Sequence, residues 1–90
     1  MTLTEKIQTA LIGSKYSGIL ETGKILSDIL GEPVYFYDSV IDDGVDDDET
    51  EDQYVMRDCF ANTSYSITIR VYYGDVTREI GYVDVTETAI

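Results

Sequence analysis

The sequence predicts an α+β fold in which two short N-terminal helices pack on a four-stranded antiparallel sheet, a β-meander. Apolar residues recur at helical spacing through residues 1–31, whereas residues 34–86 follow a two-residue period and are rich in β-branched and aromatic side chains. Glycines and turn-forming residues separate these segments. Ninety residues provide one modest core, so we expect a single domain over 1–90.

The first helix should begin at a capping box, because Thr2 and Glu5 have the spacing at which each side chain can bond the backbone amide of the other. Gly13 and Gly18 then predict a break between the helices. The second helix should end at Gly31, with Pro33 as a further stop signal. The apolar faces of the two helices comprise Leu3, Ile7, Ala10 and Leu11, then Ile19, Leu20, Ile25, Leu26, Ile29 and Leu30.

Four strands follow by composition and period. In the expected strand Tyr65–Tyr73, the apolar side chains at every second position indicate a sheet with one buried face. Residues 61–64 and 74–75 should be turns, and Gly81 a bulge, because the apolar register shifts around it. The remaining expected strands are Val34–Ile41, Gln53–Phe60 and Glu79–Thr86.

Charge is the most unusual property of the chain. Eighteen acidic residues against six basic ones give a formal net charge of −12 and a pI near 4.1. Such a surface disfavours direct contact with nucleic acid or an anionic membrane and favours a cationic partner. Generic solubility needs far less excess charge, so it does not account for the clustering of the acids.

The acids concentrate in one segment, Asp42–Asp52. Between Lys24 and Arg57 the chain has eleven acids and no base, and eight of the acids fall in this run. We expect residues 42–52 to form the loop between the first two strands, either as a solvated hairpin tip or as a binding element. Its acids are Asp42, Asp43, Asp46, Asp47, Asp48, Glu49, Glu51 and Asp52.

The residues of this run do not fit a dedicated calcium loop. If Gly44 is placed at the obligatory glycine of an EF-hand, Ile41 and Thr50 fall at liganding positions that need oxygen-rich side chains. We therefore predict no metal site and no other cofactor.

Catalytic chemistry is also poorly supplied. The chain has no histidine, which removes Ser-His and Cys-His nucleophile pairs, and its glycines form no phosphate-binding loop. Its single cysteine, Cys59, lies in a strand pattern and should be buried. We predict no catalytic residues and a protein that is not an enzyme.

The spacing of the acids permits mimicry of a nucleic-acid backbone. Side chains on one face of a strand recur about every 6.8 Å, a spacing of the same order as that of neighbouring phosphates. Asp46, Asp48 and Asp52 could imitate such a backbone, and Asp38 and Asp58, on the flanking strands, would extend the stripe.

Tyrosines add a second kind of contact group, although most of them should simply cover the sheet. Tyr72, on the polar face beside Arg70, is the best candidate for an exposed contact aromatic, and Tyr54, next to the acidic run, is the second. Either could pack on an arginine of a partner.

The acidic run Asp42–Asp52 on a compact domain of this size resembles the acidic DNA-mimic inhibitors of phages and mobile elements. These include some anti-CRISPR and anti-restriction proteins and uracil-DNA glycosylase inhibitors. The resemblance covers the acidic segment and the general build of the chain. It implies an inhibitor that occupies the basic groove of a nucleic-acid-binding protein, such as a nuclease or a CRISPR effector subunit.

Two other classes remain open: an immunity protein or antitoxin that neutralises a basic toxin, and a non-enzymatic assembly or structural module. The single cysteine, the lack of signal-peptide features at the N-terminus and the absence of a long apolar stretch predict a cytoplasmic protein.

Overall fold

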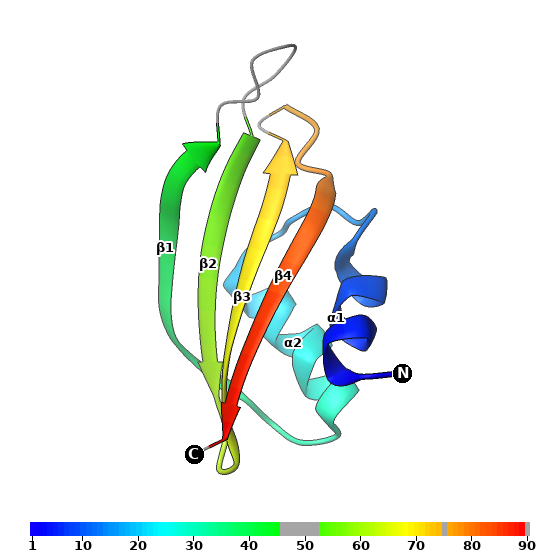
Figure 1. The fold of residues 1–90 in the computed structure, drawn as a ribbon, viewed down its shortest axis with the longest axis vertical. Coiled ribbons are helices and arrows are strands. Elements are labelled where there is room, and N and C mark those ends of the chain that lie inside the picture. The colour runs from blue at the N-terminus through cyan, green and yellow to red at the C-terminus, as the bar shows by residue number, and fades with distance from the viewer. Residues whose placement is uncertain (46–52, 75, 90) are drawn as a thin grey trace.

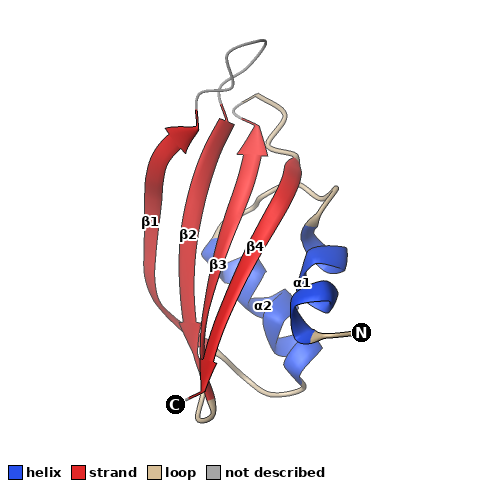
Figure 2. Cartoon of the chain, viewed as in Figure 1, coloured by secondary structure: helices blue, strands red, loops and turns tan. Residues whose placement is uncertain are grey.

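The computed structural model describes residues 1–45, 53–74 and 76–89, and of residues 42–45 and 53 only the backbone (Figure 1). The predicted α+β fold is confirmed: two N-terminal helices precede a four-stranded antiparallel sheet with strand order β1-β2-β3-β4 (Figure 2). The elements are α1 (Leu3–Leu11), α2 (Ile19–Leu30), β1 (Tyr35–Val45), β2 (Gln53–Ala61), β3 (Tyr65–Gly74) and β4 (Ile80–Ala89).

The helix ends follow the predicted signals. The Thr2 hydroxyl accepts the Glu5 amide and the Glu5 carboxylate accepts the Thr2 amide, both at 3.1 Å, so the capping box is present. Those hydrogen bonds to Thr2 lower the pKa of Glu5. Gly13 and Gly18 have positive φ angles of 92° and 108° in the connection between the helices. Gly31 adopts the left-handed conformation that ends α2.

The helices cover one face of the sheet, with α1 on β4 and α2 reaching β1. Between the layers lies the core, in which Ile7, Leu11 and Leu26 of the helices meet Phe60, Ile69 and other strand residues. The predicted alternation of β3 is confirmed, since Ile67, Ile69, Val71 and Tyr73 are buried on the helix-facing side. We call the opposite side of the sheet the outer face.

Two strand ends differ from the sequence prediction by more than one residue. Strand β1 continues to Val45, so residues 42–45 belong to the sheet rather than to a loop, and β4 continues to Ala89. The bulge predicted at Gly81 is confirmed. Tyr72 pairs with Tyr82 and the adjacent Tyr73 pairs with Ile80, which leaves Gly81 as the additional residue.

The turn at residues 61–64 is stabilised by one side chain. The Asn62 carbonyl oxygen Oδ1 accepts hydrogen bonds from the amides of Ser64 and Tyr65, each at 2.8 Å. Asn62 is itself buried and the two bonds are partly buried, so they fix the β2–β3 hairpin.

The two edges of the sheet differ in how they are covered. Strand β4 is bonded by the helical segment: Gln8 donates to the Val83 carbonyl at 2.9 Å, and Gly13 and Ser14 exchange backbone bonds with Ile80. For strand β1, in contrast, the backbone of residues 35–41 bonds only to β2 among the described residues. Figure 1 shows β1 at the edge of the sheet away from α1.

Within the described ranges, neither helix is long and apolar enough to cross a lipid bilayer.

The left-handed helix end at Gly31 generates a prediction. A Cβ at Gly31 would meet no atom within 4 Å, so Gly31→Ala tests the φ of +75° alone and should lower the free energy of unfolding by about 1 kcal/mol. Gly81→Ala is the matched control, because Gly81 has equally open space without a positive φ. It should change stability by less than about 0.5 kcal/mol in urea unfolding. Equal losses of stability in the two variants would show that the positive φ of Gly31 does not cause the loss in Gly31→Ala.

Candidate functional site

The structure places only part of the acidic run. Asp42 and Asp43 lie in the backbone of β1, where Asp42 pairs with Val55 of β2. The predicted contact residues Asp46, Asp47, Asp48, Glu49, Glu51 and Asp52 lie outside the described residues.

The four other candidate contact residues lie on different faces of the sheet. Asp38 is exposed and shares the outer face with its partner Cys59, and Tyr72 lies on the same face, half-buried, with its ring centroid 5.5 Å from that of Tyr82. Tyr54 and Asp58 lie on the helix-facing side. Tyr54 packs there near the ring of Tyr73, at 5.9 Å between centroids.

Asp58 does not extend an exposed acidic stripe, because its exposed fraction is 0%. It alternates with Met56 and Phe60 on the helix-facing side of β2, and Phe60 is also completely buried. This correction follows from the two-residue period of the strand, which assigns Asp58 to the same face as Phe60.

Two arginines occupy the centre of the outer face. Arg57 pairs with Arg70 across β2 and β3, and the row continues to Val40 on one side and Asp84 on the other. The outer face therefore carries positive as well as negative charge. Of the described acids, Asp38 on β1 and Asp84 on β4 flank this pair rather than forming a continuous stripe.

Small apolar side chains of β2 are buried on this same face although no helix covers it. Val55, Cys59 and Ala61 have exposed fractions of 4%, 8% and 7%. The predicted burial of Cys59 is thus confirmed, and its Sγ lies 3.8 Å from the Thr68 hydroxyl. Longer side chains around them, among which Tyr37 bonds Ser66 at 3.0 Å, form the accessible surface.

The buried carboxylate of Asp58 is held by two hydroxyl groups. Tyr16, in the connection between α1 and α2, donates to Oδ2 at 2.9 Å, and Ser39 of β1 donates to Oδ1 at 2.7 Å. Burial raises the pKa of Asp58, and the bonds from Ser39 and Tyr16 partly oppose that increase. Burial and the hydrogen bond to Asp58 also raise the pKa of Tyr16.

Tyr16 is fixed in turn by Arg78, which precedes β4. The Tyr16 amide donates to the Arg78 carbonyl at 2.8 Å, and the Arg78 guanidinium Nε donates to the Tyr16 carbonyl at 3.2 Å. The guanidinium carbon lies 5.3 Å from the ring centroid of Tyr73, which stacks on Tyr16 at 4.8 Å. Hydrogen bonds thus join four segments that are distant in sequence, which contain Tyr16, Ser39, Asp58 and Arg78.

An apolar groove of about 550 Å³ lies between α2 and β1. Its floor contains Phe60 and Gly23, and a Cβ at Gly23 would lie 3.3 Å from the Phe60 ring, so a larger residue there would narrow the groove. At its rim, Leu20 of α2 and Phe36 of β1 have exposed fractions of 64% and 48%. The sequence marked Leu20 and Phe36 as apolar but did not show that they would remain exposed.

The described residues contain no group of three or more histidine, cysteine, aspartate or glutamate side chains placed to hold a metal ion. What the described surface offers is a mixed outer face, an apolar groove and an exposed strand edge, each of which can bind a macromolecule.

No protein-family model, curated protein or solved structure gives a significant match to this chain.

The buried carboxylate generates a pH prediction. Because the pKa of Asp58 is higher in the folded than in the unfolded chain, its contribution favours folding at acidic pH and is lost as pH rises through the folded pKa. Asp58→Asn keeps acceptor and donor groups for Tyr16 and Ser39 but removes this dependence. Relative to the Asn variant, the native chain should become less stable as pH rises, as measured by urea unfolding.

If the free energies of unfolding of the native chain and of Asp58→Asn differ by the same amount at every pH, the pKa of Asp58 is not raised in the folded chain. Asp58→Ala provides the comparison, because it removes both acceptors and leaves two hydroxyls without their partner. It should cost about 1–3 kcal/mol.

Proposed function

We propose that this chain is a non-enzymatic binding protein that presents an acidic surface to the basic nucleic-acid-binding site of another protein. Its most concrete form is a phage-type inhibitor of a CRISPR effector or another host nuclease. The observation that supports it is the distribution of charge. Eleven acids and no base lie between Lys24 and Arg57, a stretch that runs from the second half of α2 through β1 to the first residues of β2.

The physical basis of the proposed inhibition is competition. A groove that binds DNA uses lysine and arginine to replace the counterions of the phosphates, and a dense set of carboxylates can satisfy the same groups. Exposed Asp38 on β1 continues the acidic character of the run onto the sheet. Arg57 and Arg70 lie on β2 and β3, so the proposed binding surface is the β1 side of the molecule.

An immunity protein that neutralises a basic toxin would use the same surface, and the two classes differ in the protein that is bound. A third candidate, an assembly module, is favoured by a separate observation, the exposed apolar residues of β1, which include Tyr35, Tyr37 and Ile41.

The experiment is capture of bacterial proteins on the immobilised chain, followed by competition with duplex DNA. A nuclease or other DNA-binding protein that is released by DNA and by increasing salt supports the proposal. Simultaneous binding of DNA and this chain to the captured protein would contradict it. Capture of a basic toxin without DNA-binding activity would assign the chain to the immunity class instead.

Charge reversal at two positions of the acidic run should weaken inhibition strongly. Asp47→Lys with Asp48→Lys should weaken binding by on the order of tenfold or more and reduce its dependence on salt. The matched control, Glu79→Lys with Glu87→Lys, makes the same change in net charge at or near β4, where both side chains are exposed. The control should retain inhibition in a DNA-cleavage assay. Equal effects of the two variants would show that net charge, and not the run, determines binding.

A further inference from the structure

The free edge of β1 is an unusual surface for a folded chain. The backbone of 35–41 bonds only to β2 within the described ranges, so its outward N–H and C=O groups have no partner among the residues that the structure describes. Natural sheets usually shield such edges, because an exposed apolar edge pairs with other strands. The first part of β4 is bonded by Gln8, Gly13 and Ser14 at Val83 and Ile80, whereas no helical segment bonds the backbone of β1 over residues 35–41 among the described residues.

Strand β1 carries exposed apolar or aromatic side chains on both faces. On the helix-facing side, Phe36 and Ile41 have exposed fractions of 48% and 58%, and on the outer face Tyr35 and Tyr37 have 62% and 57%. On the helix-facing side Phe36 borders the groove against α2. A further strand added beside β1 would cover both faces, with alternate side chains directed to the groove and to the outer face.

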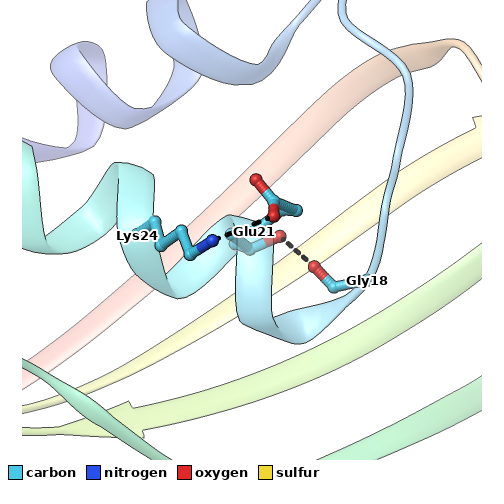
Figure 3. A network of polar contacts seen from close by, with 4 residues as sticks. Gly18, Glu21 and Lys24 are labelled. Carbon is cyan, nitrogen blue, oxygen red and sulfur yellow. Dashed lines mark hydrogen bonds and ion pairs between the residues drawn. The ribbon is translucent and has the colours of Figure 1, made fainter.

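Charge identifies the kind of strand that fits. Asp38 is exposed on the outer face of β1, and Asp28 is exposed at the rim of the groove. Lys24, which also lines the groove, is ion-paired with Glu21 at 3.3 Å near the start of α2, beside Gly18 (Figure 3). A second copy of this chain would bring another net charge of −12 to the edge, whereas a basic strand is attracted.

We propose that β1 accepts an extended, positively charged strand of a partner protein by β-strand addition. The partner's apolar residues enter the groove beside Phe36 and Leu20, and its lysine or arginine residues lie over Asp38 and the tyrosines of the outer face. This inference rests on the proposed function only for the positive charge of the partner. The contact residues are those of β1 and α2, and none belongs to 46–52.

The probe is a nine-residue peptide with blocked ends that alternates lysine and valine, which places all its valines on one face when it is extended. Two control peptides keep its charge. One has the same composition with the lysines and valines in separate blocks, and the other is methylated at alternate backbone amides so that one edge cannot donate hydrogen bonds. The alternating peptide should bind at least tenfold more tightly than either control in calorimetry.

Matched variants of the chain locate the peptide. Asp38→Lys on β1 should weaken binding more than Glu87→Lys on β4, which makes the same charge change at the opposite edge. Leu20→Ser should weaken binding, whereas Val76→Ser, at a residue with an exposed fraction of 78% outside the groove, should not. In NMR, the amides of 35–41 should show the largest shifts on addition of the peptide.

Three results would overturn the inference: equal affinity for the alternating and the methylated peptide, equal effects of the Asp38 and Glu87 changes, or a dimer of the chain whose amides 35–41 are protected. Strand addition can fail in these tests while the acidic run still inhibits a nuclease. Conversely, the peptide can bind as expected while Asp47→Lys with Asp48→Lys leaves inhibition intact. The two proposals are therefore tested separately.

Discussion

A buried carboxylate, that of Asp58, is the constraint on which the arrangement of this molecule depends. An ionised group out of contact with water is costly unless hydrogen-bond donors surround it, and here the donors come from Tyr16 and Ser39. Tyr16 belongs to the connection between the helices, and Ser39 belongs to β1. Satisfying one acid therefore fixes the helical layer and the edge strand relative to β2. The guanidinium of Arg78 extends this constraint to the start of β4 through the ring and backbone of Tyr16.

The open side of the molecule follows from the same arrangement. Helix α1 packs on β4, and the connection 13–16 bonds the segment that leads into β4, so the helical layer is displaced from β1. Ser39 connects β1 to the buried site through its hydrogen bond to Asp58, but Phe36 and Ile41 of β1 remain exposed on the helix-facing side. The groove and the uncovered edge thus belong to one feature, a sheet that is wider than its helical cover.

Local signals in the sequence were sufficient for the architecture. The Thr2–Glu5 capping box, the left-handed end at Gly31 and the bulge at Gly81 are each determined by a few neighbouring residues, and all three are present. Placement of Asp58 depends on tertiary structure instead, because an aspartate in a strand is usually exposed. The sequence signal for its burial is that Asp58 lies two residues from Phe60 and therefore on the same face of the strand. The pairing of Arg57 with Arg70 could not be read from either strand alone, because it depends on register.

The bonds between the N-terminal segment and the last strand affect the order of folding. Gln8, Gly13 and Tyr16 find their partners at Val83, Ile80 and Arg78, more than sixty residues later in the chain. The hairpins of the meander, in contrast, join neighbouring segments and require only short loops to close. Helix α1 precedes β4 in the chain, so its docking surface on β4 is available only after β4 has been synthesised. Docking of α1 therefore has to wait for the last strand, although α1 precedes all four strands in the sequence.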